Sequence, residues 1–171
     1  MIRRRFRSYG RGARGALAVA ALLLSPVGAA RASDLVLDVY GLSYHPDRNG
    51  VHAAHVDNQF NPGLGLRYER AHDARGIAFV EAGTYLDSGR HWAAFAGPGY
   101  QYKLGDWRPG VALVLFNSPT YNHGRPFIAP IPLLGYDFGA VRLNVVYAPR
   151  VAHYNDFEVF GFYLSIPLPR F

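Results

Sequence analysis

Stretches rich in Val, Leu, Tyr and Phe alternate along most of the chain with short clusters of Gly, Asn, Asp and Pro. Apolar stretches bounded by such turn-forming clusters are typical of β-strands. Beyond residue 32, no stretch combines a helical apolar stripe with capping residues at both ends. The pattern predicts eight strands, many near the length that a tilted strand needs to cross a bilayer. They cover residues 34–45, 61–70, 76–87, 91–104, 107–117, 126–137, 140–149 and 157–171.

The connections between the predicted strands differ in length in a regular way. Those after the second, fourth and sixth strands are short: AHDAR, GD and FG. The long ones are residues 46–60, 118–125 and 150–156. Outer-membrane barrels have short periplasmic turns and long external loops, so we expect an all-β fold, an eight-stranded antiparallel transmembrane β-barrel. A secreted β-sandwich is the alternative, because it also consists of short strands separated by turns.

Several predicted strands are apolar on both faces, as in GVALVLF at 110–116 and VFGFYLSI at 159–166. A strand between lipid and a water-filled lumen should instead alternate between apolar and polar residues. A barrel of eight strands is narrow, and its lumen is filled by side chains or holds one small ligand. An apolar lumen favours a bound hydrocarbon chain over a path for ions.

Prolines occur in the two neighbouring strands six and seven, at Pro130, Pro132 and Pro149. Proline has no N–H group to donate to the next strand, so it weakens strand pairing locally. The prolines predict a gap between these strands through which a lipid could enter sideways. The alternative is that they only mark strand ends.

The chain begins with a basic segment, MIRRRFRSYGRGARG, followed by the short apolar run ALAVAALLLSPVG and the small-residue stretch AARA. This order is typical of a cleaved secretory signal peptide. We expect a signal peptide at 1–32 and one domain at 33–171. At the other end the chain finishes with Phe171, as outer-membrane barrels do, although soluble strands can end in the same way.

The formal charge of +6 has to be recounted for the exported chain, because seven of the eighteen basic residues lie in the predicted leader. Eleven basic side chains then face twelve acidic ones, a net charge of 11 − 12 = −1. A nucleic-acid partner is therefore not expected. The seven are Arg3, Arg4, Arg5, Arg7, Arg11, Arg14 and Arg31.

Chemically reactive side chains meet at the predicted outer rim. The first strand ends at His45 and the third at Asp87 and Ser88, and both strands run outward. An imidazole, a carboxylate and a hydroxyl can act as base, orienting group and nucleophile in acyl transfer. Alternatively, His45 is an ordinary rim residue, and Asp87 and Ser88 open a turn, for which both are common choices.

Metal and cofactor chemistry has little support in the sequence. The chain contains no cysteine, so neither a disulfide nor a thiolate metal site is possible. The other histidines fall mostly in predicted loops and lack the spacing of a ligand set. HVDN at 55–58 and HYND at 153–156 could hold a cation only weakly. No cofactor and no metal are expected.

Two longer segments resemble the lipid A palmitoyltransferase (PagP) family. YLDSGRHWAAFAGPGYQY at 85–102 matches the family's aromatic-x-Asp-Ser segment, tryptophan and Gly-x-Gly-aromatic motif, and APIPLLGYDFGAVRLNVVYAPR at 129–150 matches its proline-flanked strands. The resemblance assigns a catalytic, pocket or gate role to six residues. It implies catalytic roles for His45, Asp87 and Ser88, the floor of an acyl-chain pocket for Gly99, and the sides of a lateral lipid gate for Pro132 and Pro149.

The resemblance also implies an activity. It is transfer of a palmitoyl chain from the sn-1 position of a glycerophospholipid to a hydroxyacyl chain of lipid A in the outer leaflet of the bacterial outer membrane. His45 would be the general base, oriented by Asp87, and Ser88 either an acyl acceptor or a hydrogen-bond partner. We expect a membrane-embedded monomer or homodimer. The alternatives are a non-enzymatic outer-membrane barrel and a lipid A deacylase.

Overall fold

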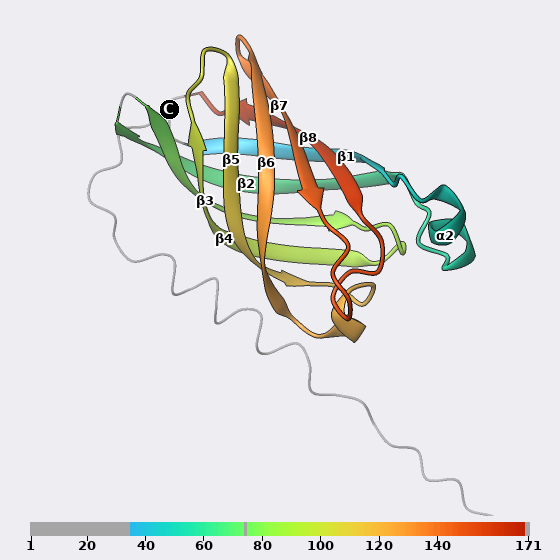
Figure 1. Cartoon of the computed structure of the whole chain (residues 1–171). Coiled ribbons are helices and arrows are strands. Elements are labelled where there is room, and N and C mark those ends of the chain that lie inside the picture. Colours follow the sequence, from blue (N-terminus) through green and yellow to red (C-terminus); the bar gives the residue numbers. More distant parts are fainter. Residues whose placement is uncertain (1–34, 74, 170–171) are drawn as a thin grey trace, which may run out of the picture. The chain divides into compact units, whose positions relative to one another are not determined.

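The computed structural model describes residues 35–73 and 75–169. The predicted signal peptide at 1–32 and the terminal Phe171 lie outside the described residues. Consecutive antiparallel strands form a closed barrel in chain order (Figure 1). The strands are β1 (Leu35–Tyr44), β2 (Phe60–Asp73), β3 (Gly76–Leu86), β4 (Trp92–Tyr102), β5 (Trp107–Asn117), β6 (Phe127–Phe138), β7 (Val141–Ala148) and β8 (Val159–Pro167).

Closure of the barrel decides between the two predicted fold classes. Strand β1 pairs with β2 on one side and with β8 on the other, so the sheet joins back on itself. The prediction of an eight-stranded antiparallel β-barrel is therefore confirmed, and the two-layer sandwich is excluded.

The barrel wall is apolar on its outer face as well as toward the lumen. On β5, the buried Ala112 and Val114 alternate with the exposed Val111, Leu113 and Leu115. Successive side chains of a strand point to opposite faces, so the exposed set lies on the outside of the barrel. A soluble monomer rarely exposes a contiguous apolar surface of this kind. The outer wall is therefore suited to apolar surroundings.

Short turns join the strands at one end of the barrel and longer loops at the other, as predicted. The β1–β2 loop contains a short helix, α2 (Arg48–Ala53), that the sequence pattern did not predict. Its N-terminus is capped by Asp47, whose Oδ1 accepts from the Gly50 backbone N–H at 2.9 Å. Within the part of the chain that is described, no helix is long and apolar enough to cross a bilayer.

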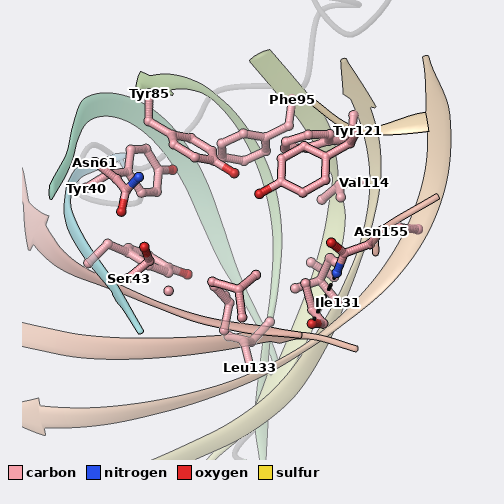
Figure 2. Close-up of a pocket in the computed structure, with 18 of the residues that line it drawn as sticks. Tyr40, Ser43, Asn61, Tyr85, Phe95, Val114, Tyr121, Ile131, Leu133 and Asn155 are labelled. Carbon is pink, nitrogen blue, oxygen red and sulfur yellow. Dashed lines mark hydrogen bonds between the residues drawn. The ribbon is translucent and has the colours of Figure 1, made fainter. Parts of the chain in front are cut away.

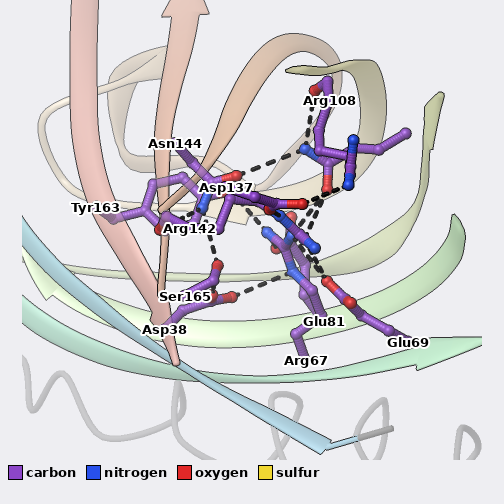
Figure 3. A network of polar contacts seen from close by, with 11 residues as sticks. Asp38, Arg67, Glu69, Glu81, Arg108, Asp137, Arg142, Asn144, Tyr163 and Ser165 are labelled. Carbon is purple, nitrogen blue, oxygen red and sulfur yellow. Dashed lines mark hydrogen bonds and ion pairs between the residues drawn. The ribbon is translucent and has the colours of Figure 1, made fainter. Parts of the chain in front are cut away.

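Polar side chains fill the lumen toward the end with the short turns (Figure 3). At their centre is the fully buried Arg67, whose Nε lies 3.3 Å from Asp38 Oδ2 and whose Nη2 lies 2.8 Å from Glu81 Oε2. Buried charges of this kind are stable only when they are paired. Together with Arg67, Asp38 and Glu81, the following residues form the "lumen network": Glu69, Arg108, Asp137, Arg142, Asn144, Tyr163 and Ser165.

The sheet is incompletely paired between β6 and β7. Their register pairs run from Leu133 opposite Val146 to Phe138 opposite Val141. The first half of β6, residues 127–132, pairs with β5 but has no register partner in β7. The gap in hydrogen bonding predicted from the prolines is therefore present, at the end of the barrel that carries the long loops.

Candidate functional site

Two of the predicted catalytic residues are in direct contact. His45 follows β1 directly, and Ser88 lies in the loop that follows β3. His45 Nε2 lies 2.9 Å from Ser88 Oγ, and both residues are almost fully buried. Because β1 and β3 run in the same direction, their ends reach the same rim of the narrow barrel, as expected from the strand order.

The protonation of the His45 ring follows from its second contact. Nδ1 lies 3.2 Å from the main-chain carbonyl oxygen of Glu158. A carbonyl oxygen can only accept, so Nδ1 carries the proton and donates it. Nε2 is then unprotonated and accepts the hydrogen of the Ser88 hydroxyl. The pair has the arrangement of a general base and an activated serine nucleophile.

The fully buried Asp87 carboxylate organises the turn that presents Ser88. Its Oδ1 accepts from the backbone N–H groups of Gly89 and His91, each at 2.9 Å. Its Oδ2 accepts a hydrogen bond from the Ser118 hydroxyl. These donors tie both sides of the loop to one carboxylate, so the position of Ser88 depends on Asp87.

This geometry differs from the orienting role predicted for Asp87. Both nitrogens of the His45 ring already have other partners, Ser88 Oγ and the carbonyl oxygen of Glu158. Asp87 therefore acts on the serine side of the pair, and a main-chain carbonyl orients the imidazole. The reason is that two donors of its own turn and the Ser118 hydroxyl from the loop between β5 and β6 satisfy the Asp87 carboxylate.

Loop residues that the sequence analysis did not select complete the site. The Asn58 backbone N–H donates to Ser88 O, and Asn58 Nδ2 donates to Asp87 O, both at 3.1 Å. Asn58 thus links the β1–β2 loop to the β3–β4 loop. In the sequence it stood out only within HVDN, as a weak cation ligand. Ser118 and Glu158 gave no signal, because they act through contacts between distant loops.

Tyr121, from the loop between β5 and β6, lines the same cavity as Ser88. Burial, together with the nearby Asp87 charge, raises the pKa of Tyr121 to about 12. The phenol therefore keeps its proton at neutral pH and can donate a hydrogen bond to a negative charge that develops beside Ser88.

An apolar cavity of about 370 Å³ extends from the Ser88 side chain into the barrel (Figure 2). Tyr85, Phe95 and Tyr121 form one side of it, and Val114, Ile131 and Leu133 form another. A largely apolar pocket with few polar groups at its mouth is typical of a site for an apolar ligand. The lining therefore suits an apolar group that ends near Ser88.

Gly99, predicted as the pocket floor, does not line this cavity. A Cβ atom added to Gly99 would lie 2.1 Å from the Phe79 ring. Phe79 is buried and packs with Ala112 and Leu133, which do line the cavity. The absent side chain of Gly99 therefore makes room for Phe79, and the aromatic ring closes this part of the lumen.

The predicted gate prolines lie along the β6–β7 gap. Pro149, directly after β7, lines the cavity together with Ile128 and Pro130 from the unpaired half of β6. Pro132 is the last β6 residue before the β6–β7 ladder begins, and it pairs with Val111 of β5. The cavity thus borders the part of the wall in which strand pairing is missing.

The environment of His45 predicts the pH dependence of a reaction that uses it as a base. Burial lowers the pKa of His45, against the smaller raising effect of its hydrogen bond to the Glu158 carbonyl. The imidazole then stays neutral to a lower pH than free histidine, whose pKa is about 6.5. For such a reaction we expect the acidic limb of kcat/KM to have its midpoint below that value, measured with the purified protein between pH 4 and 8. A midpoint above it would contradict the assignment.

The same lowered pKa has a consequence for stability. The unfolded chain binds a proton at this histidine at a higher pH than the folded chain does. The free energy of unfolding contributed by His45 is therefore fully present above about pH 6.5 and decreases as the pH falls toward the folded pKa.

Comparison with known proteins does not assign the chain to a family. It matches no protein-family model and no curated protein. Within residues 35–73 and 75–169, no group of three or more His, Asp or Glu side chains is placed to hold a metal ion. The function has to be inferred from the geometry of the site and from the motifs in the sequence.

Proposed function

We propose that the protein is an acyltransferase of the bacterial outer membrane that moves a palmitoyl chain from the sn-1 position of a glycerophospholipid to lipid A. The observation that carries the proposal is the 2.9 Å contact between His45 Nε2 and Ser88 Oγ at the end of an apolar cavity. The contact supplies the chemistry of ester exchange, and the cavity supplies space for the chain.

The surface of the barrel supports a location in a bilayer. Exposed aromatic side chains gather near both ends of the strands, as in the aromatic girdles of outer-membrane barrels. At the loop end they are Tyr44, Phe60 and Trp92, and at the turn end Tyr102, Trp107 and Phe138. Between the two girdles the outer face is apolar, which fits lipid tails.

In the first step, the Ser88 oxygen attacks the carbonyl carbon of the phospholipid ester while its proton moves to His45 Nε2. The negative charge on the carbonyl oxygen is stabilised by a hydrogen bond from Tyr121. When the ester bond breaks, the leaving glycerol oxygen takes the proton from Nε2. The products of this step are an acyl-serine and a lysophospholipid, and His45 is neutral again.

In the second step, a hydroxyl group of lipid A replaces the lysophospholipid. His45 Nε2 removes its proton as the hydroxyl oxygen attacks the acyl-serine carbonyl carbon. The bond to the Ser88 oxygen then breaks, and Ser88 recovers the proton from the imidazolium. No cofactor takes part, because one ester is exchanged for another.

The direct test is mass spectrometry of lipid A from cells that express the full chain. We expect a mass gain of one palmitoyl group in the lipid A of expressing cells, and lysophospholipid in their membranes. Cells carrying the empty vector provide the baseline. Release of lysophospholipid and free fatty acid without acylated lipid A would point to a hydrolase. An unchanged lipid profile with folded protein in the membrane would overturn the proposal.

Removing the Tyr121 hydroxyl should slow the reaction without changing the cavity. Because the phenol donates to the developing oxyanion, Tyr121→Phe is expected to lower kcat about a hundredfold with little change in KM. The measurement is the rate of lysophospholipid release by the purified protein. Tyr154→Phe is the matched control, since Tyr154 also lines the cavity from an outer loop. Equal rates for the two variants would remove this role.

A further inference from the structure

The oxygen that holds the His45 ring lies outside the strand ladders. It is the main-chain oxygen of Glu158, 3.2 Å from His45 Nδ1, and Glu158 directly precedes β8. The pairing of β8 with its neighbour β7 begins at Val159 opposite Ala148, and extending this register by one residue places Pro149 opposite Glu158 (Figure 1). Proline has no N–H group to donate. The Glu158 oxygen is therefore left for the imidazole, and contacts other than the sheet have to fix its position.

The side chain of Glu158 makes one such contact. Its Oε2 accepts from the Tyr147 hydroxyl of β7 at 2.9 Å. Tyr147 lies between Val146 and Ala148, which line the cavity, so its side chain points to the opposite, outer face of the wall. There its ring packs on Phe160 of β8, with 4.9 Å between the ring centroids. Glu158 thus bonds an outward-facing tyrosine through its side chain and the reactive histidine through its main chain.

The residue before Glu158 is held as well. A Cβ atom added to Gly50 of α2 would lie 2.7 Å from Phe157 Cε1, so the Phe157 ring packs closely against this helix. Phe157 fixes the segment against the β1–β2 loop, and Glu158 fixes it against β7. Because a carboxylate is a strong acceptor, the hydrogen bond from Tyr147 is stronger than one between neutral groups. The main chain at Glu158 therefore has little freedom to carry its carbonyl away from His45.

We propose that Tyr147 and Glu158 are positioning residues for His45, and that their hydrogen bond on the outer face of the barrel keeps the imidazole proton on Nδ1. With Nδ1 protonated, Nε2 is the free base that faces Ser88. If the carbonyl moves away, the proton can occupy Nε2, and the ring then donates to Ser88 Oγ instead of accepting from it. This effect on the ring holds for any reaction at Ser88, whereas its effect on acyl transfer rests on the proposed function.

The position of the proton can be measured without turnover, from the nitrogen chemical shifts of the imidazole ring. The sample is the folded barrel in detergent micelles, labelled with nitrogen-15 at histidine and kept at a pH at which histidine is neutral. The His45 signals are assigned by their absence from His45→Ala. We expect the proton on Nδ1 in the wild type and a mixture of both tautomers in Tyr147→Phe. A wild type with the proton on Nε2 would overturn the inference.

Two changes at Glu158 separate its hydrogen bond from its charge. Glu158→Gln still accepts from the Tyr147 hydroxyl and should keep the wild-type tautomer, whereas Glu158→Ala cannot accept and should give the mixture. Tyr44→Phe is the matched control for Tyr147→Phe. Tyr44 is 46 % exposed and adjacent to His45 in the chain, and its hydroxyl has no hydrogen bond to the described residues, so the tautomer should not change. The wild-type tautomer in both Tyr147→Phe and Glu158→Ala would overturn the positioning role.

The transfer reaction supplies a second readout. Tyr147→Phe should lower kcat about threefold to tenfold, the effect of one net hydrogen bond, and leave KM unchanged because the cavity is intact. The hydrogen bond to the Glu158 carbonyl raises the pKa of His45, so weakening it should move the midpoint of the acidic limb to lower pH. A change in KM alone would overturn the positioning role. Absence of transfer by the wild type would overturn the proposed function, and the tautomer measurement would still test the inference.

Discussion

Replacing Ser88 with alanine is expected to lower kcat for acyl transfer at least ~1,000-fold, because the acyl-serine cannot form. His45→Ala should have a loss of similar size, since the Ser88 hydroxyl would lose the base 2.9 Å away. The two residues act as one unit, so the double variant should be no slower than either single variant. The measurement is transfer of a labelled palmitoyl chain from phosphatidylcholine to lipid A by the purified protein in mixed micelles.

The controls for this result use a histidine from the same loop as His45 and a serine from the loop between β5 and β6. His52→Ala removes an exposed histidine that pairs with Asp57 and should change kcat less than about twofold. Ser118→Ala removes a hydrogen bond to Asp87 and should have an intermediate effect, because the turn loosens but the nucleophile remains. Full activity of folded Ser88→Ala would rule out the acyl-serine, and full activity of His45→Ala would rule out this base.

Replacing Arg67 with methionine is expected to destabilise the barrel by about 3–5 kcal/mol. The side chain is fully buried and pairs with Asp38 and Glu81, so its removal leaves carboxylates without their cation. Methionine fills similar space, which separates the charge effect from a cavity effect. The free energy of unfolding would be measured by guanidinium titration of the protein in lipid vesicles, followed by tryptophan fluorescence.

An exposed arginine provides the comparison. Arg90 pairs with Asp57 at 3.3 Å on the loop surface, where water screens the charges. Arg90→Met should change stability by no more than about 1 kcal/mol. The double variant Arg67→Met/Glu81→Gln should recover part of the loss, because one stranded charge is neutralised. A similar loss for Arg67→Met and Arg90→Met would show that the lumen network contributes little to stability.

The strands could be predicted from sequence because apolar stretches and turn clusters are local signals. Observed strand ends lie close to the predicted ones for β5, at Trp107–Asn117, and for β6, at Phe127–Phe138. Helix α2 was missed because six residues carry too little pattern, although the Asp47 cap is a local feature. Closure of the barrel through the β1–β8 pair depends on residues far apart in the chain, so no local signal predicts it. We expected it only from the number of strands and the lengths of their connections.

The site was predictable only as far as strand direction determines it. The meeting of His45 and Ser88 followed from two strands that end at one rim. Asp87 was placed correctly in the loop but given the wrong partner, because turn geometry decides where a carboxylate points. Tyr121 could not be found, since it reaches Ser88 across the barrel mouth. The sequence did not show that the Phe79 ring fills the space beside Gly99, because this contact depends on side-chain packing between strands.

The missing pairs between β6 and β7 determine where a substrate has to be before it reacts. An acyl chain that passes through this gap stays in a hydrocarbon environment, whereas a chain that first entered water would lose about 0.8 kcal/mol for each methylene group exposed. The reaction rate should therefore depend on the number of substrate lipid molecules per unit area of the membrane around the barrel. If the proposed reaction takes place, diluting the substrate lipid within the bilayer should slow it, and adding more bilayer of the same composition should not make it faster.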